Sequence, residues 1–166
     1  MSDRKDTLQK AIVKNGIIDL GYGSAGGGTF AYCTNLKSII LPNGLMYIKQ
    51  ACFEGCKSLT NISLPDSVIS IDNAAFPDCS SLVNITIPEG VTSIYSYTFS
   101  DCSSLASITI PESVTSIEPA FYNCSSLTNI TYNGTQSQWN KISKKSTWKI
   151  DSSIKTITCT DGVITL

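Results

Sequence analysis

Cysteine offers the widest range of chemistry in this chain, because a thiolate can ligate a metal, act as a nucleophile or form a disulfide. The chain has seven cysteines, and no two of them form the Cys-x-x-Cys pair that suits structural zinc. Five recur at intervals of 23, 23, 23 and 22 residues: Cys33, Cys56, Cys79, Cys102 and Cys124. This period favours free thiols that fill one repeating buried position as small hydrophobic side chains. Side chains in such a row point the same way, which is a poor geometry for disulfides.

Carboxylates form the second set of candidate ligands. Three of them directly follow a proline, and an asparagine takes that place in the first copy: Asp66, Glu89, Glu112 and Asn43. Oxygen ligands repeated along a stack would suit Ca²⁺, but each copy has one carboxylate and no ligand loop rich in Gly and Asp. The pattern therefore favours solvated turns, as it does for Asp78 and Asp101, which precede a cysteine. We expect neither a metal site nor another cofactor.

The chain lacks the usual catalytic groups. It has no histidine, so neither a Ser-His nor a Cys-His couple can form. The glycine-rich stretch 21–28 is not followed by the Lys-Ser/Thr of a phosphate-binding loop. Twelve basic residues against 13 acidic ones give no basic excess for nucleic acid. No run of eighteen apolar residues predicts a membrane span, and we expect a protein that is not an enzyme.

Two tryptophans stand among lysines near the C-terminus. Trp139 and Trp148 share this segment with four basic residues: Lys141, Lys144, Lys145 and Lys149. If the indole rings are exposed, this group would suit a glycan or an anionic surface. The alternative is that the tryptophans seal the end of the hydrophobic core while the lysines solvate it.

The cysteines belong to a repeat with further columns of Phe, Leu, Pro and Ile in register. One copy is Phe76-x-x-Cys79-x-x-Leu82-x-x-Ile85-x-Ile87-Pro88-x-x-Val91-x-x-Ile94. The alternation Ile85-Thr86-Ile87 predicts a short strand with one buried face, which Pro88 ends. A second extended segment returns through Val91-x-x-Ile94, and the Phe-x-x-Cys turn closes the coil. One coil buries too little apolar surface to fold alone, so about five coils must stack with parallel ladders between equivalent residues.

The two ends of the stack should be capped. Residues 3–14 place Leu8, Ala11 and Ile12 on one face of a short helix. Ile17 and Ile18 fall near the strand position, and residues 21–28 form a wide turn or link. After Tyr132 the repeat dissolves into a cap that ends in a hairpin, with Asp161-Gly162 as the turn between 157–159 and 163–164. The predicted organisation is one structural domain with three parts: 1–28, 29–131 and 132–166.

These units resemble the BspA-like class of leucine-rich repeats, found on bacterial surfaces and in some parasitic protozoa. The tail is similar too, through Tyr132-Asn133-Gly134-Thr135, Trp139 and Thr158–Gly162, so the likeness covers residues 29–166. The resemblance implies a mainly β, right-handed solenoid with a parallel sheet on its concave face, here with a short N-terminal helix and an irregular C-terminal cap. Surface members of the family carry export signals, whereas the polar Met1–Asp6 is not followed by an apolar segment. We therefore expect a cell-surface or secreted location if a signal was removed, and a cytoplasmic or phage-associated one otherwise.

The outward strand positions on that face form the predicted binding surface. They are uncharged and rich in hydroxyls and amides: Asn61, Ser63, Asn84, Thr86, Ser107, Thr109, Asn129 and Thr131. Five strands spaced about 4.8 Å apart and about 20 Å long give roughly 500 Å², below the roughly 800 Å² per partner of a standard interface. We expect this face to bind weakly unless rims, tandem copies or oligomers assist it.

The predicted function is adhesion to, or recognition of, a host or partner protein, as the resemblance implies. One alternative is a structural part of a surface or phage-tail assembly that self-associates through its ends. A weaker alternative is carbohydrate binding at the tryptophan-rich cap.

Overall fold

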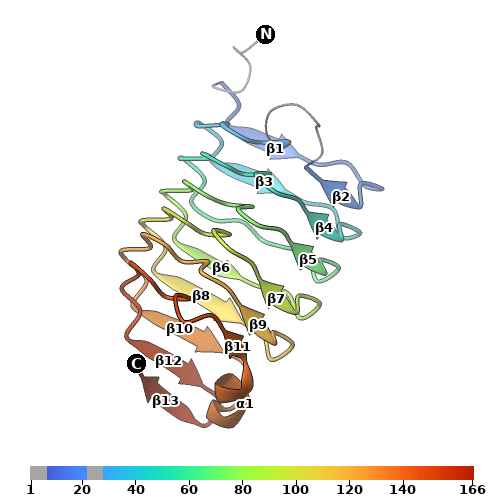
Figure 1. Ribbon diagram of the computed structural model, residues 1–166. Helices are drawn as coiled ribbons and strands as arrows, with labels where there is room; N and C mark the ends of the chain where they lie inside the picture. Colours follow the sequence, from blue (N-terminus) through green and yellow to red (C-terminus); the bar gives the residue numbers. More distant parts are fainter. Residues whose placement is uncertain (1–6, 22–27) are drawn as a thin grey trace.

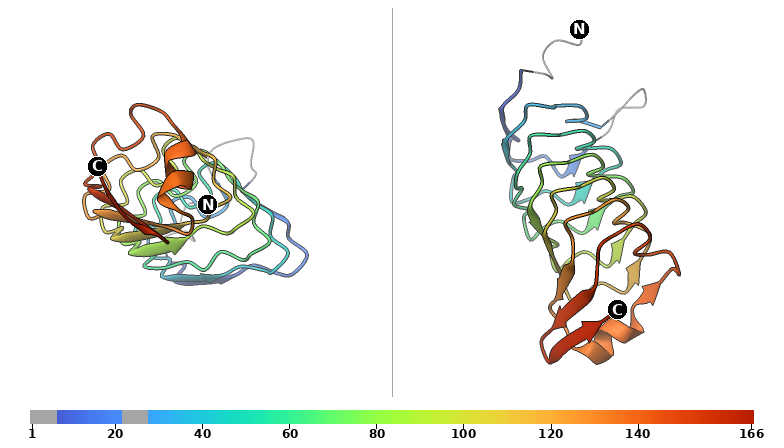
Figure 2. Two further views of the ribbon diagram at one scale, coloured as in Figure 1. Left: turned by 90° about the horizontal axis from the view of Figure 1, so that it is seen from below. Right: turned by 90° about the vertical axis from the view of Figure 1, so that its left-hand side faces the viewer.

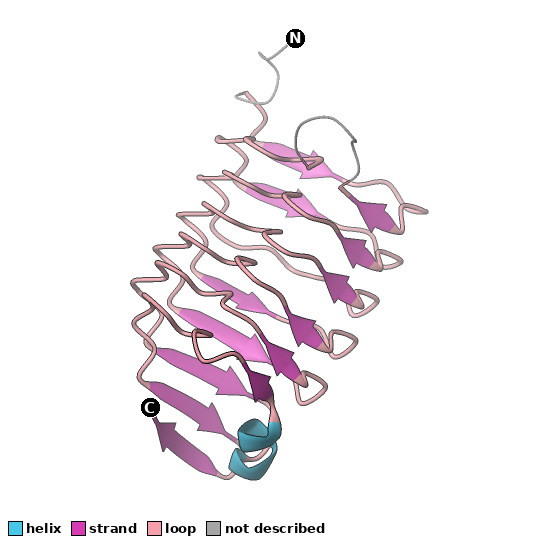
Figure 3. Cartoon of the chain, in the orientation of Figure 1, coloured by secondary structure: helices cyan, strands magenta, loops and turns pink. Residues whose placement is uncertain are grey.

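The computed structural model describes residues 7–21 and 28–166, which form one stack of coils (Figures 1 and 2). Two sides of the coils carry strands. What we call the first wall contains β1 (Lys10–Ile12), β3 (Ser38–Ile40), β6 (Asn84–Thr86), β8 (Ser107–Ile110), β10 (Asn129–Tyr132), β12 (Thr156–Cys159) and β13 (Gly162–Thr165). The second wall contains β2 (Asp19–Leu20), β4 (Tyr47–Ile48), β5 (Ser70–Ile71), β7 (Ser93–Ile94), β9 (Ser116–Ile117) and β11 (Ser143–Lys144). Among the described residues the only helix is α1 (Gln136–Lys141), so the fold is a mainly β solenoid (Figure 3).

The first wall has the alternation that the repeat predicts. Ile85, Ile108 and Ile130 pair in register across β6, β8 and β10, and all three side chains are buried. Their neighbours on either side point outward, because successive residues of a strand face opposite sides of the sheet. The prediction of parallel strands with one buried face is therefore confirmed.

The third wall is the Phe-x-x-Cys turn, whose rings form a continuous stack in the core. Consecutive phenylalanine rings lie within 13° of parallel, with centroids 4.9 to 6.0 Å apart, from Phe30 to Phe121. Each turn is tight; for example, the Cys33 N–H donates to the Phe30 carbonyl at 3.1 Å. The predicted turn and the predicted rows of identical side chains are both present.

Left-handed backbone conformations explain how the third wall forms its own ladder. The residue two positions after each Phe has positive φ in every copy: Tyr32, Gly55, Asp78, Asp101 and Asn123. These residues rotate the backbone so that N–H groups point along the stack, as in the Phe53 N–H bond to the Ala75 carbonyl at 2.9 Å. Asp and Asn tolerate this conformation better than most residues. The acids before the cysteines therefore occupy turns, and their backbone conformation supplies a reason that the sequence pattern did not.

The predicted N-terminal helix is wrong over its described part. Lys10–Ile12 form β1, which pairs in parallel with β3, while residues 3–6 lie outside the described residues. The spacing of Leu8 and Ala11 is compatible with a helix, but hydrogen bonds to the next coil outweigh that local pattern. Ile17 and Ile18 do fall near a strand, since they directly precede β2 and the Ile18 carbonyl accepts from the Met46 and Tyr47 N–H groups, but both side chains are exposed.

An insertion lengthens this first coil. Lys10 pairs with Ser38, an offset of 28, which exceeds the 23-residue period by five. Asp19 pairs with Tyr47 at the same offset, so the extra residues follow β2 and fall in the glycine-rich stretch. Residues 22–27 of that stretch lie outside the described residues. Gly28 lies directly against the next coil, where a Cβ would come within 2.3 Å of the Ala51 carbonyl oxygen.

The C-terminal segment is irregular at residues 145–155, as expected of the cap, but it also contains a helix and a hairpin. β12 and β13 form the predicted antiparallel hairpin, but its two-residue turn is Thr160-Asp161, one residue before the predicted Asp161-Gly162, because Gly162 pairs with Cys159. Before it, α1 begins with a capping box, in which the Thr135 hydroxyl accepts from the Gln138 N–H and the Gln138 side chain accepts from the Thr135 N–H. The Thr-x-x-Gln spacing is a helix-start signal that our sequence reading did not use.

The ladders are interrupted, contrary to the expectation that they run unbroken along the stack. On the first wall, residues 61–64 form no strand and touch the sheet through one isolated bridge, Asn61 to Asn84. On the second wall, β5 and β7 belong to different sheets. The second-wall gap lies at the junction between the coil of residues 53–71 and the coil of residues 76–94. The first-wall gap lies on both sides of residues 61–64, which also form no ladder with β3.

Candidate functional site

The structure places the eight predicted binding residues in two rows on the first wall. One row contains Asn61, Asn84, Ser107 and Asn129, and the other contains Ser63, Thr86, Thr109 and Thr131. The members of each row follow one another across neighbouring coils, as the repeat predicts. Their exposure divides them, however. Five of the eight side chains are exposed: Asn61, Ser63, Asn84, Thr86 and Ser107. The other three are half-buried: Thr109, Asn129 and Thr131.

The C-terminal end of this surface is occupied by its own hydrogen bonds. The Asn129 Oδ1 accepts from the Thr156 hydroxyl at 2.8 Å and from the Thr158 hydroxyl at 3.0 Å. Both threonines belong to β12, which extends the two rows by one strand beyond the predicted set. An amide oxygen with two internal donors has little capacity left for a ligand.

The N-terminal half of the predicted set lines a groove of about 500 Å³. Its walls come from two consecutive coils: Asn61, Ile62, Ser63, Leu64, Asp66, Asn84, Thr86 and Pro88. We call this the junction groove. Its lining segment 61–64 runs between β3 and β6, where the first wall is interrupted (Figure 1). Four of the eight predicted residues therefore share one concavity, which the sequence pattern did not single out.

An apolar pair continues the second row beyond the groove. Ile12 of β1 and Ile40 of β3 pair in register and are 75% and 62% exposed. Both occupy the position that Ser63 and Thr86 hold in later coils. Ile40 stood in the outward column of the repeat, but Ile12 was hidden by the helix assignment. Two neighbouring exposed isoleucines on a sheet face are an unusual use of apolar surface.

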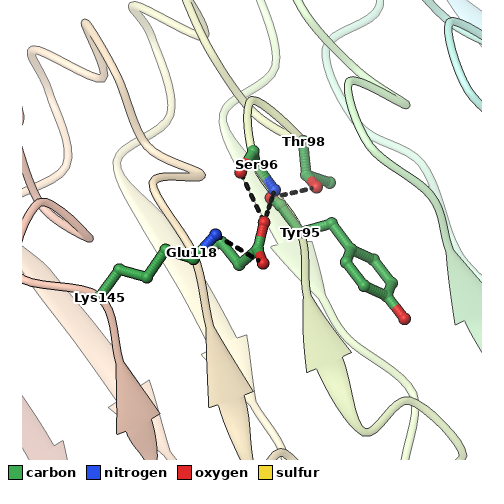
Figure 4. A network of polar contacts seen from close by, with 5 residues as sticks. All are labelled: Tyr95, Ser96, Thr98, Glu118 and Lys145. Carbon is green, nitrogen blue, oxygen red and sulfur yellow. Dashed lines mark hydrogen bonds and ion pairs between the residues drawn. The ribbon is translucent and has the colours of Figure 1, made fainter.

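The second wall carries a polar network that links three coils (Figure 4). The Glu118 Oε2 accepts from the Ser96 N–H at 3.2 Å and from the Ser96 hydroxyl at 2.6 Å, while Lys145 lies 3.0 Å from Oε1. The Ser96 hydrogen bonds, followed by Lys145, lower the pKa of the Glu118 carboxyl below its usual value. Beside it, the Thr98 hydroxyl donates to the Tyr95 carbonyl at 2.7 Å. This arrangement ties β7, β9 and β11 together and leaves no free carboxylate for chemistry at that point.

The tryptophan-rich cap does not present an aromatic platform. Trp139 is 1% exposed and Trp148 is 8% exposed, and their rings meet edge to face. Lys144 covers the Trp139 ring and donates to the Trp139 carbonyl at 2.6 Å; burial lowers the pKa of its ammonium group. The indoles thus seal the core, and the carbohydrate hypothesis loses the exposed rings on which it depended.

All seven cysteines are buried thiols outside any disulfide. Four of them make the same contact: the thiols of Cys56, Cys79, Cys102 and Cys124 donate to a phenylalanine carbonyl of the preceding coil at 3.0 to 3.2 Å. Burial raises the pKa of the Cys124 thiol to about 12 and that of Cys102 well above its usual value. Within the described part of the chain, no group of three or more Cys, Asp or Glu side chains is placed to hold a metal ion.

Comparison with known families identifies the repeat. The family model for the BspA type leucine rich repeat region matches residues 24–150 in six copies. A search among curated proteins gave no match. Within the described residues, the single helix is neither long nor apolar enough to cross a membrane.

Two solved structures are similar to this chain. A leucine rich cell surface protein from Faecalibacterium prausnitzii A2-165 matches at 34% identity with a TM-score of 0.72, over 83% of this chain and 35% of that protein. A leucine-rich repeat protein from T. pallidum matches at 34% identity with a TM-score of 0.59, over 63% of this chain and 52% of that protein. This chain therefore corresponds to about a third of the first protein's length and about half of the second's.

Proposed function

Because the chain belongs to the BspA-type leucine-rich repeat family, we propose that it is a non-catalytic module that binds a partner protein through the outer face of its first wall. The Faecalibacterium relative is a leucine rich cell surface protein, which supports an adhesive role at a bacterial surface. The site chemistry agrees, since the exposed rows offer hydrogen-bonding groups without a nucleophile–base couple.

The observation that carries this proposal is the pair of polar rows. Successive strands hold the side chains of Asn84 and Ser107, and those of Thr86 and Thr109, at one-strand spacing on a backbone fixed by ladder hydrogen bonds. Such a surface is ordered before it binds, so little conformational entropy is lost on association. Amides and hydroxyls both donate and accept, which suits the polar surface of a protein.

Substitution of both groove-facing residues of β6 tests the proposal. We expect Asn84→Lys/Thr86→Lys to weaken binding of the chain to a panel of immobilised extracellular-matrix proteins, because two long cations replace short neutral groups. The matched control is Thr92→Lys/Ser104→Lys, which introduces the same charge at exposed positions outside the first wall. Thermal unfolding checks that both variants fold. Unchanged binding by a folded Asn84→Lys/Thr86→Lys variant would remove the first wall from the proposal.

A further inference from the structure

We propose that the junction groove is the specificity-determining subsite of this surface, and that it takes an extended peptide segment of the partner, neutral or basic and with an apolar residue at one end. This inference rests on the proposed function and narrows it to a place and a ligand class. Three features of the molecule support it: the backbone beside the groove, the groove lining and the neighbouring isoleucines.

The first feature is the incomplete ladder on the two sides of the groove. Ser107 N–H donates to the Val83 carbonyl and Ile87 N–H to the Thr109 carbonyl, so the odd-numbered residues of this segment face β8. By the alternation of a parallel ladder, the N–H and C=O of Thr86 face residues 61–64. Within the described segments 61–66 and 84–88, the Asn61–Asn84 bridge and the Val83 N–H bond to Thr60 are the backbone links between the coils. The groove therefore presents backbone groups that an added strand can pair with.

The local sequence explains why the ladder stops here. Residues 61–64 are Asn-Ile-Ser-Leu, whereas the strand-forming coils have Asn-Ile-Thr-Ile at 84–87 and Ser-Ile-Thr-Ile at 107–110. Ser63 and Leu64 replace two β-branched residues, which pack better on a pleated sheet. The interruption is thus encoded in two side chains, and it can be reversed by changing them.

The second feature is the chemistry of the lining. Asn61 and Asn84 supply amides, Ser63 and Thr86 supply hydroxyls, and Asp66 supplies the one charge. Among these lining residues there is no Lys or Arg for an anionic ligand and no aromatic ring on which a sugar could stack. Carboxamides match the donor and acceptor pattern of a peptide backbone. Asp66 favours a basic residue of that peptide over an acidic one.

The third feature is the apolar pair beside the groove. Ile40 belongs to the coil that precedes residues 61–64, and Ile12 to the coil before that, so their strands β3 and β1 lie on the N-terminal side of the segment that lines the groove (Figure 1). An apolar peptide side chain on these isoleucines would bury surface that is now hydrated. Asp66 lies three residues beyond Ser63, the counterpart of Ile40 in the next coil. The expected ligand therefore has an apolar and a basic residue about three positions apart.

The experiment restores the ladder and asks whether the peptide is lost. The probe is a phage-displayed library of random peptides of about 12 residues, selected on the immobilised wild-type chain. Enriched peptides are synthesised, and their affinities are measured by fluorescence polarisation. We expect Ser63→Thr/Leu64→Ile, which makes the segment Asn-Ile-Thr-Ile, to weaken binding about ten-fold or more, because the backbone groups then pair internally. Ser116→Thr is the matched control, since it adds the same methyl group to β9, a second-wall strand with partners on both sides.

Hydrogen exchange links the result to its cause. In the double variant, the amides of residues 64 and 86 should become protected, which shows that the ladder has closed. Thr86→Lys blocks the groove without repairing the ladder and should also abolish binding, while Asp66→Asn should weaken the basic peptides selectively.

Three outcomes would overturn the inference. Peptides that lose affinity for Asn84→Lys/Thr86→Lys but bind the closed-ladder variant normally would place the contact on the first wall outside the groove, and the proposed function would stand. Failure of the library to yield any peptide against the folded chain would reject the peptide class, whatever the matrix-protein panel shows. Hydrogen exchange could instead show that the ladder stays open in Ser63→Thr/Leu64→Ile. In that case Thr86→Lys decides: if it binds the peptides with unchanged affinity, the junction groove is not their binding site.

Discussion

At the scale of single residues, the cysteine column has a purpose beyond filling space. Four of its five thiols, those of Cys56, Cys79, Cys102 and Cys124, donate to a phenylalanine carbonyl of the preceding coil, so the column both packs the core and satisfies buried acceptors. Alanine would pack but not donate, and serine would donate but is more costly to bury. The period of the sequence predicted burial and free thiols correctly, but a hydrogen bond between coils is not visible in the spacing.

Two cysteines in this column should differ in their value to stability. The Phe76 carbonyl accepts from Cys102 alone among the described contacts, whereas the Phe99 carbonyl accepts from both the Cys124 thiol and the Cys102 N–H. Cys102→Ala should therefore lower the free energy of unfolding by about 1–3 kcal/mol, and Cys124→Ala by less, because only the first change leaves a buried acceptor unpaired. Urea titration of the two variants measures the difference. Equal losses would show that packing alone decides the value of the column.

The buried thiols should also make the fold sensitive to alkali. Burial raises the pKa of Cys52, Cys79, Cys102 and Cys124, so the unfolded chain ionises first as the pH rises. The stabilisation is present below the unfolded thiol pKa of about 9 and is lost above it, with up to about 1.4 kcal/mol per pH unit for each thiol. Urea titrations from near-neutral to alkaline pH test this. The four-fold Cys→Ala variant is the control and should have a much flatter profile.

The Glu118 carboxylate should protect the fold at the acid side. Its pKa is lowered by Ser96 and Lys145, so its contribution is present above the unfolded carboxyl pKa and is lost as the pH falls through the folded one. Glu118→Gln should destabilise the chain near neutral pH by no more than about 1 kcal/mol, since the group is partly exposed. The difference from wild type should vanish below the folded pKa. Glu89→Gln, an exposed site in the turn after Pro88, is the control and should change stability little at either pH.

At the scale of elements, the local sequence pattern predicted strands wherever buried and exposed residues alternate. It failed where pairing with a neighbouring coil determines the secondary structure. The segments around Ile85 and the hairpin of β12 and β13 were predictable, because their own residues carry the alternation and the turn. Lys10–Ile12 was assigned to a helix, because its apolar spacing fits both structures and only pairing with β3 separates them. Likewise, four predicted binding residues line the junction groove because of how two neighbouring coils are spaced. The repeat could not reveal this groove, since it implies the same spacing between all coils.

Gly28 illustrates an element boundary set by a close approach. A Cβ there would lie 2.3 Å from both the Ala51 carbonyl oxygen and the Cys52 Cα, which are backbone atoms that cannot rotate away. Gly28→Ala should therefore push the first two coils apart and cost about 2 kcal/mol or more. Gly44→Ala is the matched control, because a Cβ at Gly44 meets nothing within 4 Å. Removing backbone freedom there should be neutral or stabilising by up to about 1 kcal/mol. Thermal unfolding of both variants tests the pair, and similar behaviour would contradict the close approach.

At the scale of the whole molecule, the junction between the coil of residues 53–71 and the coil of residues 76–94 separates two blocks. Across it the third wall is intact, with Ala51, Phe53 and Gly55 donating to the next coil at 2.8 to 2.9 Å. The second wall has no ladder there, since β5 and β7 belong to different sheets, and the first wall has one bridge. Stack stability is a sum of coil terms and neighbour terms, so a weak neighbour term is where cooperativity should fail first.

The two blocks should therefore unfold at different denaturant concentrations. Both tryptophans, Trp139 and Trp148, lie in the C-terminal block, where β6, β8, β10, β12 and β13 form one sheet of five strands. Far-ultraviolet circular dichroism reports both blocks, whereas tryptophan fluorescence reports the C-terminal one alone. We expect the dichroism signal to begin falling at lower urea, because the N-terminal block has fewer paired strands to hold it. In Ser63→Thr/Leu64→Ile the closed ladder should strengthen the junction and bring the two transitions together. Coincident transitions in the wild-type chain would mean that the third wall alone couples the two blocks. The missing ladders of the first and second walls would then not reduce the cooperativity of unfolding.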